Sequence, residues 1–277
     1  MQGTRGTRWR GSSAESLNAT LDALEGVLAD GADGATVGAD LFAAADVMRE
    51  QPALRRAATD PRIGAETKTV LVREVFAAHL DESAMNVLAE AVTHRWAAGH
   101  DLPDALAHVA VVADVRAADV AGDGDQLEEE LFRFSRVVAD SPALRDALSD
   151  PARTVADKQA LVGDLVGGKV TPAGETLLRR AVTTTHLTVS SALDDFIEIT
   201  SATRGRMVAR VWSARPLSDA AVDRLTAALG RLYDGTVHLN VIEQPDLLGG
   251  LRVEIGDEVI DGTVRTRLDD ARRRLAG

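Results

Sequence analysis

The chain has 277 residues, 45% of them hydrophobic and 27% charged, and its formal net charge at pH 7 is −12. This length allows two or three globular modules, and the acidic balance argues against a nucleic-acid surface, which requires clustered Lys and Arg. The absence of cysteine excludes disulfides, thiolate catalysis and Cys-based zinc sites. No apolar run reaches the ~18 residues of a spanning helix, so we expect a soluble intracellular protein that reaches a membrane only through partners.

The N-terminal part of the chain follows a helical period. Residues 1–11 are expected to be a flexible N-terminus, and a capping box of Ser12 with Glu15 is predicted to open the first helix. The stripes predicted to be buried are Leu17, Leu21, Leu24 and Leu28, then Val72, Val75, Phe76 and Leu80, then Leu88, Ala91, Val92 and Trp96. A segment from about 102 to 120 is expected to close a first helical bundle, at residues 12–120, and to open a second one.

An internal repeat extends this pattern. Shifted by 90 residues, Leu41–Thr93 aligns with Leu131–Thr183 without a gap, and 17 of the 53 aligned residues are identical. The longest identical run is Pro52-Ala53-Leu54-Arg55, which recurs as Pro142-Ala143-Leu144-Arg145. Identities at such spread positions are difficult to attribute to an alanine-rich composition. We therefore interpret the two segments as an internal duplication, with a second helical bundle at residues 121–205.

Helix boundaries recur between the copies as well. Asp60-Pro61 and Asp150-Pro151 predict helix ends, and Thr171-Pro172 predicts an N-cap followed by proline at the first helical position. The loop Ala121-Gly122-Asp123-Gly124 is expected to end the segment that joins the bundles. The buried positions predicted for the second copy are Leu127, Leu131, Phe134, Val138, Leu161, Leu165, Val166, Leu178, Ala181 and Val182.

After about residue 206 the apolar period changes from that of a helix to that of a strand. Strands are predicted around Val208–Trp212, Val237–Val241, Leu251–Ile255 and Val259-Ile260, the last two joined by a Gly256-Asp257 turn. A helix capped by Ser218 is expected to place Val222, Leu225, Leu229 and Leu232 inward, and Asp261 or Thr263 to cap a final helix with Val264, Leu268, Ala271 and Leu275 inward. We predict a mainly α protein, two tandem related helical bundles followed by a small α+β C-terminal domain at residues 206–277.

The C-terminal residues carry a specific pattern. A Gly-Gly pair precedes a strand, a Gly-Asp hairpin follows, and Val-Ile-Asp-Gly-Thr-Val-Arg leads into an arginine-rich helix. This pattern resembles the C-terminal signature of the delta subunits of F-type ATP synthases, homologues of the mitochondrial oligomycin-sensitivity-conferring protein. The signature residues are Leu248, Gly249, Gly250, Val253, Gly256, Asp257, Val259, Ile260, Asp261, Gly262, Val264, Arg265, Arg267 and Leu268. The extra helical copy is similar to the long form of the subunit found in high-GC Gram-positive bacteria.

Each signature residue has a local reason to be there. Glycines at 249 and 250 allow a bulge or a close backbone approach at a strand start, and Gly256 supplies the positive φ of a two-residue turn. Folding and direct partner contact both remain open as their role. The same holds for the arginines of the final helix, which form either a solvated face or a docking surface for a stalk helix. These arginines are Arg265, Arg267, Arg272, Arg273 and Arg274.

The resemblance implies a non-catalytic stator subunit without a cofactor. Its implied partners are the N-terminal helix of an alpha subunit and the b subunit of the peripheral stalk, with one copy per complex at the cytoplasmic face of the bacterial membrane. A soluble helical-repeat adaptor that binds amphipathic peptides is the alternative, although it gives no reason for the C-terminal signature. An enzyme is the weakest reading, because the sequence shows no nucleophile with a base and no paired carboxylates.

Two apparent sites fail on inspection. Gly163 to Lys169 imitates a phosphate-binding loop, but Val170 has no hydroxyl for magnesium, and we interpret the segment as a helix end before a new N-cap. The histidines are scattered with no pair at ligand spacing beside a carboxylate, so we expect no metal site. Trp96 and Trp212 are expected to lie in the core.

Overall fold

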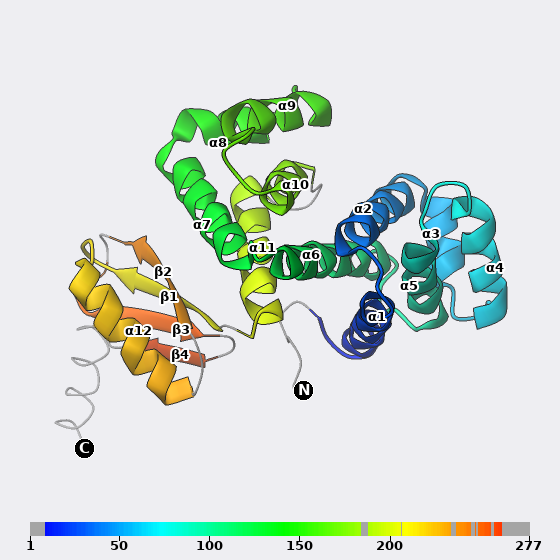
Figure 1. Cartoon of the computed structure of the whole chain (residues 1–277), viewed down its shortest axis with the longest axis horizontal. Coiled ribbons are helices and arrows are strands. Elements are labelled where there is room, and N and C mark those ends of the chain that lie inside the picture. Colours follow the sequence, from blue (N-terminus) through cyan, green and yellow to red (C-terminus); the bar gives the residue numbers. More distant parts are fainter. Residues whose placement is uncertain are drawn as a thin grey trace, which may run out of the picture. The chain divides into compact units, whose positions relative to one another are not determined.

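The computed structural model describes residues 9–183, 188–205, 207–233, 237–244, 247, 249–255 and 258–261. The chain forms two compact units, and the boundary lies between Thr200 and Ser201. The first unit is helical, and the second contains a small sheet with one described helix (Figure 1). The mainly helical architecture with a C-terminal α+β unit is therefore confirmed.

The helices of the first unit occur at regular intervals along the chain. The first five are α1 (Ser12–Ala29), α2 (Gly34–Glu50), α3 (Pro52–Thr59), α4 (Ala65–Phe76) and α5 (Glu82–Thr93). A long helix, α6 (Asp101–Ala121), follows. The remaining helices are α7 (Gly124–Asp140), α8 (Pro142–Ser149), α9 (Val155–Val166), α10 (Pro172–Ala181) and α11 (Val189–Thr203).

The helix bounds confirm the duplication. Adding 90 to the bounds of α2, α3 and α4 gives the bounds of α7, α8 and α9 at both ends, and α5 and α10 begin at equivalent residues, Glu82 and Pro172. The same shift places α1 on residues 102–119, which lie within α6. Helix α6 packs on α2 of the first copy and on α7 and α10 of the second. The prediction that one segment closes the first bundle and opens the second is confirmed.

Most predicted helix ends agree with the structure. Asp60 and Asp150 are the C-cap residues of α3 and α8, and Thr171 caps α10 by accepting a hydrogen bond from the Gly174 backbone N–H at 3.0 Å. Gly122, at a φ of 83°, ends α6 in the left-handed conformation that favours glycine.

The predicted capping box at the start of α1 is wrong. Gly11 occupies the N-cap, no side chain caps the helix, and Ser12 is its first residue. The neighbouring serines are instead buried against the loop between α5 and α6. Ser13 Oγ donates to Asp101 Oδ2 at 2.6 Å, and Ser16 Oγ donates to the Arg95 carbonyl at 2.7 Å. These side chains therefore fix that loop on α1.

The helical cores contain most of the side chains predicted for them, including Leu17, Leu24, Trp96, Leu127 and Leu178. Two predictions are wrong at equivalent positions of the copies. Val75 of α4 is 41% exposed and Leu165 of α9 is 40% exposed. Each immediately precedes a buried residue, Phe76 or Val166, which takes the inward position on the helix.

The second unit is a four-stranded mixed sheet in the order β2-β1-β3-β4. Its strands are β1 (Met207–Ser213), β2 (Val237–Glu243), β3 (Leu251–Ile255) and β4 (Glu258–Asp261). Strands β1 and β2 are parallel, and helix α12 (Asp219–Tyr233) supplies the crossover that a parallel pair needs. The pairs β1–β3 and β3–β4 are antiparallel.

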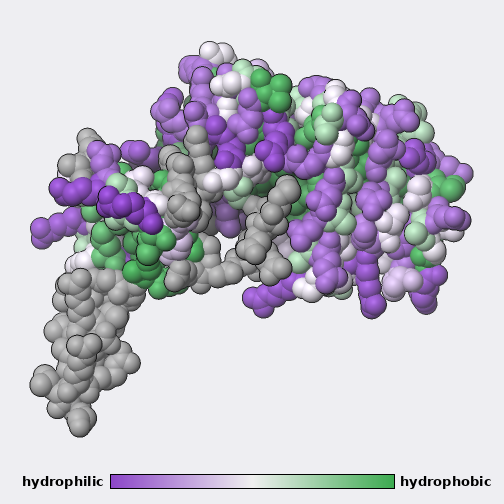
Figure 2. Space-filling model, turned by 60° about the horizontal axis from the view of Figure 1, so that its bottom comes forward, coloured by the Kyte–Doolittle hydropathy of each residue, from purple (hydrophilic) through white to green (hydrophobic). Residues whose placement is uncertain are grey.

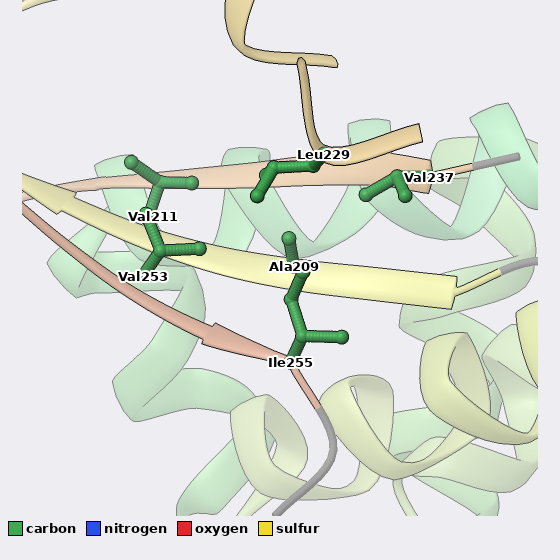
Figure 3. Packing of buried hydrophobic residues seen from close by; sticks show 6 residues of the cluster. All are labelled: Ala209, Val211, Leu229, Val237, Val253 and Ile255. Atoms are coloured by element: carbon green, nitrogen blue, oxygen red, sulfur yellow. The ribbon is translucent and has the colours of Figure 1, made fainter. Parts of the chain in front are cut away.

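One face of this sheet forms the core of the unit. The buried cluster consists of Ala209, Val211, Leu229, Val237, Val253 and Ile255 (Figure 3). Leu229 comes from α12, and Leu225 and Tyr233 of the same helix pack against the cluster. The inward prediction for Leu232 is wrong, because this side chain is 66% exposed and the next residue, Tyr233, takes the packed position.

The surface differs between the two units on the face drawn in Figure 2. Hydrophilic residues predominate over the helical unit, whereas apolar residues gather on part of the sheet unit. The large apolar side chains exposed on the described part of the sheet unit are Leu232, Val259 and Ile260.

Candidate functional site

The described residues contain no group of three or more His, Asp or Glu that could hold a metal ion. None of the described helices combines the length and the apolar character needed to cross a membrane. The features left to describe are the C-terminal signature, the sheet surface and the contacts that build the helical copies.

The signature glycines set up the start of β3. Gly249 and Gly250 have φ angles of 96° and 86°, in the left-handed region that side chains other than glycine rarely adopt. Val253 then lies in the core, paired with Val211 of β1 on one side and Ile260 of β4 on the other. The positive φ angles are a backbone reason for glycine at both positions.

Strand β4 is the last strand of the sheet in the described residues, and it presents apolar side chains. Val259 is 50% exposed and Ile260 is 38% exposed, and Asp261 ends the strand opposite Arg252. The register pairs Ile255 with Glu258, which leaves two residues between β3 and β4. The other predicted site residues lie outside the described residues. They are Leu248, Gly256, Asp257, Gly262, Val264, Arg265, Arg267, Leu268, Arg272, Arg273 and Arg274, and the predicted final helix lies there too.

The sheet carries an aromatic contact on the face opposite its core. Trp212 follows Val211 in β1, and because successive strand residues alternate between faces, it points away from the core. The guanidinium of Arg252, its register partner in β3, lies 5.1 Å from the centroid of the Trp212 ring. The core prediction for Trp212 is therefore wrong: the side chain is half-buried and stacked under a cation.

The segment that imitates a phosphate-binding loop is a helix end. Helix α9 ends at Val166, and Gly167 and Gly168 follow, the latter at a φ of 69°. Lys169 donates its Nζ to the Leu165 carbonyl at 3.0 Å, so its ammonium satisfies the end of the helix. The predicted new N-cap is confirmed at Thr171.

Each helical copy contains the same anchor between its second helix and the start of its fifth. In the first copy, Asp40 Oδ2 of α2 accepts a hydrogen bond from the Asp81 backbone N–H at 2.6 Å. In the second copy, Glu130 of α7 accepts from the Thr171 backbone N–H at 2.9 Å and from its hydroxyl at 2.8 Å. Asp81 and Thr171 are the N-cap residues of α5 and α10. Because Asp81 accepts the Ser83 backbone N–H, the pKa of its carboxyl is lowered.

Close helix packing joins α2 to α6. A Cβ at Gly34 would lie 2.7 Å from the Ala113 carbonyl oxygen, and one at Gly38 would lie 2.6 Å from Asp114 Oδ1. Asp114 is 3% exposed, and burial raises the pKa of its carboxyl to about 8. Its Oδ2 has no hydrogen-bond partner among the described residues.

Sequence reasoning missed this buried carboxyl and the side chains around it. Asp114 lies inside the run Val111-Val112-Ala113-Asp114-Val115, where a charged residue on an apolar helix was a readable signal. It also missed Arg180 of α10, which forms an ion pair with Asp46 of α2 at 2.5 Å.

Comparison with known proteins places these features in a family. The family model described as "ATP synthase delta (OSCP) subunit" matches residues 111–275. An ATP synthase subunit delta of Kineococcus radiotolerans is 43% identical over 269 residues, which are 96% of this chain and 98% of that protein. The same subunit of a Nocardioides species is 44% identical over 97% of both chains.

A further relative also aligns over nearly the whole of both chains. The subunit delta of Streptomyces avermitilis is 39% identical over 96% of this chain and 98% of its own. Among solved structures, a chain of the Toxoplasma gondii mitochondrial ATP synthase hexamer matches 60% of this chain and 95% of its own, at 20% identity and a TM-score of 0.41. The family model begins within α6, whereas the curated relatives align from near the N-terminus, so they share the first helical copy. The chain belongs to the ATP synthase delta (OSCP) subunit family.

Proposed function

We propose that the chain is a non-catalytic stator subunit, which links the catalytic alpha/beta head of an F-type ATP synthase to the b-subunit peripheral stalk and so couples proton flow to ATP synthesis. The observation that carries this proposal is the family match, which extends over nearly the whole chain and its relatives. The division into two compact units supports it, because a linker between two assemblies needs two separate surfaces.

The helical unit contacts the head in this proposal. An amphipathic N-terminal helix of an alpha subunit packs its apolar side on the helical copies, as in other helix-in-groove complexes. The sheet unit contacts the stalk, with β4 and the arginine-containing segment after it as the docking region. The exposed Val259 and Ile260 give β4 an apolar component, and the arginines follow it in the sequence.

Two contacts on one chain strengthen each other. Once one unit is bound, the other is held near its own partner at a high effective concentration, so the joint grip exceeds either contact alone. One copy per complex, bound peripherally at the cytoplasmic face of the bacterial membrane, is sufficient for this role. The subunit then resists the torque of the rotor without taking part in the chemistry.

A truncation of the assembled enzyme tests the stalk contact. Removing residues 263–277 should leave ATP hydrolysis in the isolated head but lower ATP-driven proton pumping in membranes, because the head is no longer held against the rotor. A matched variant replaces Arg272, Arg273 and Arg274 by Gln and keeps the segment length. If both variants pump protons with full coupling, this region has no role in stalk docking.

Co-purification tests the wider proposal. A tagged full-length chain, extracted from membranes with a mild detergent, should elute with alpha, beta and b subunits in fixed ratio. Recovery of the chain alone from the soluble fraction, with none of these subunits, would support a free peptide-binding adaptor instead.

A further inference from the structure

The boundary between the two helical copies contains no flexible connection. Helix α6 is the last helix of the first copy and the first helix of the second, and its 21 residues include no glycine. Its one proline, Pro103, lies in the first turn, where proline is tolerated. Gly34 and Gly38 bring the α2 backbone against α6, and α10 packs on the same helix. A hinge between the copies would therefore have to bend a packed helix.

One side chain of the second copy reaches directly onto the first. Arg180 of α10 donates from Nη1 to Asp46 Oδ2 at 2.5 Å, and its guanidinium carbon lies 4.6 Å from the centroid of the Phe42 ring. Both acceptors belong to α2. The two charged side chains are 22% and 38% exposed, so the contact is partly shielded from water.

The contact continues to α6. Asp46 Oδ1 also accepts from Arg49 at 3.2 Å, and Arg49 in turn contacts Asp104 Oδ1 and the Pro103 carbonyl, each at 3.2 Å. Alternating charges thus connect α10 of the second copy, α2 of the first and the helix that both share.

The two copies differ in charge at the positions that make this contact. The residue equivalent to Arg180 in the first copy is Glu90, and the residue equivalent to Asp46 in the second copy is Arg136. If α10 carried an acidic residue at this position, as α5 does, two carboxylates would face each other. The exposure agrees with this asymmetry, because Phe42 is 3% exposed while its counterpart Phe132 is only half-buried, and Arg136 is exposed. The α2 surface is covered by the other copy, and the α7 surface is not covered in the same way.

We propose that Arg180 fixes the second helical copy on the first through Asp46 and Phe42, so that the two copies behave as one rigid body. The added copy is then a rigid extension of the helical unit rather than a separately moving module. This inference concerns the chain alone and holds whether or not the proposed partners bind.

Distance measurements on the full-length chain test the proposal. Because the sequence contains no cysteine, spin labels can be attached at two introduced cysteines without background. Glu66→Cys on α4 and Asp164→Cys on α9 are exposed and lie in different copies, on helices other than α2 and α10, which make the contact (Figure 1). Double electron–electron resonance should give a narrow distance distribution in the parent protein.

Three substitutions decide the outcome. Arg180→Ala and Asp46→Asn should each broaden the distribution, because either one removes the contact from its own side. Arg133→Ala is the matched control: this exposed arginine of α7 pairs with Glu129 inside the second copy, so its removal should leave the distribution unchanged. Circular dichroism would establish that each variant retains its helix content.

An unchanged distribution in either Arg180→Ala or Asp46→Asn would overturn the proposal, since the contact needs both partners. Equal broadening by Arg133→Ala would also overturn it, because the effect would then reflect a general loosening of the second copy.

Discussion

Glu130 accepts hydrogen bonds from both the backbone N–H and the hydroxyl of Thr171, the residue that caps α10. The carboxylate is 3% exposed and also accepts from Gln126 at 2.8 Å. Asp40 makes a simpler version of this contact with Asp81 in the first copy, at 2.6 Å. An acidic anchor at the start of the fifth helix is thus shared by the two copies, and it is buried in the second copy.

Removing the anchor should destabilise the second copy. Glu130→Ala leaves the Thr171 N–H without its acceptor in a buried place, and a loss of about 2–3 kcal/mol is expected from charge-assisted hydrogen bonds of this kind. Urea unfolding followed by circular dichroism measures it. Glu129→Ala serves as the control, because its carboxylate is 70% exposed and its pair with Arg133 should contribute less than about 0.5 kcal/mol. Equal losses in the two variants would contradict the structural role of Glu130.

The longer side chain of Glu130 depends on a glycine that faces it. A Cβ at Gly174 would lie 2.2 Å from Glu130 Oε2, whereas the first copy combines the shorter Asp40 with Ala84 at the equivalent position. Gly174→Ala should therefore cost about 1–3 kcal/mol through overpacking. Combining it with Glu130→Asp should recover part of that loss, as a double-mutant cycle in urea would show. Strict additivity of the two substitutions would argue against this steric coupling.

Substitution of glycine by alanine should change the free energy of unfolding in opposite directions at Gly34 and at Gly26. Gly34→Ala places a Cβ 2.7 Å from the Ala113 carbonyl oxygen, a backbone atom that cannot move aside, so a loss of about 1–3 kcal/mol is expected. Gly26 of α1 has nothing within 4 Å of such a Cβ, so Gly26→Ala should stabilise the protein by about 0.5–1 kcal/mol through helix propensity. Thermal unfolding of both variants provides the comparison, and a stabilised Gly34→Ala would show that α2 and α6 are less closely packed.

The buried Asp114 should make stability depend on pH. Burial raises the pKa of its carboxyl to about 8 in the folded chain, above the ordinary value of 3.8. Between these values the folded state holds a proton that the unfolded state has lost, so the contribution of Asp114 is fully present below the lower value and lost as pH rises through the upper one. The free energy of unfolding should fall by about 1.4 kcal/mol per pH unit from this group, and Asp114→Asn should remove that slope.

Urea unfolding at several pH values between about 5 and 7 measures the slope. Asp60→Asn is the matched control. Hydrogen bonds from Arg62 lower the pKa of Asp60 to about 2, so its contribution is present above the ordinary value of 3.8 and is lost only as pH falls towards the lower value. The slope between about pH 5 and 7 should therefore be unchanged in that variant. A parent and an Asp114→Asn variant with parallel profiles would rule out a titrating carboxyl at this position.

The sequence was most informative where the physics is local. Proline at Thr171-Pro172 and the Asp-Pro pairs fix helix ends through dihedral angles of one or two residues, and these predictions agree with the structure. The 90-residue repeat gave the helix pattern of the second copy from that of the first. The strand pattern also held, because successive strand residues alternate between faces, and this alternation places Val211 and Val253 together on the core face.

Predictions failed where the choice depended on a neighbour from elsewhere in the chain. Ser12 and Glu15 match a capping box, but the nearby Ser16 hydrogen-bonds the Arg95 carbonyl in the loop after α5. A helical stripe allowed Leu232 to point inward, and only the position of the sheet favours Tyr233 instead.

Pairs that changed together between the copies were equally hidden. Gly163 leaves room for the Arg179 guanidinium, which donates to the Gln159 carbonyl at 3.0 Å. The first copy has Arg73 and Ala89 at the equivalent positions, so the arginine comes from the other helix of the pair. When the copies are compared position by position, the difference between Arg73 and Gly163 and that between Ala89 and Arg179 look unrelated. The contact between Gly163 and Arg179 accounts for both. The pair of Arg180 with Asp46 between the copies was not predicted either, because it also depends on two positions that differ between the copies.

The shared helix α6 has a consequence for how such a chain can evolve. A repeat of 90 residues adds five helices, not six, since each new copy begins with the helix that ends the previous one. Recombination between equivalent positions of two such helices would lengthen the gene by one repeat without adding a linker. In the product, the shared helix would be continuous. The chain can therefore gain a repeat without passing through a form in which the two copies are connected by an unpacked linker.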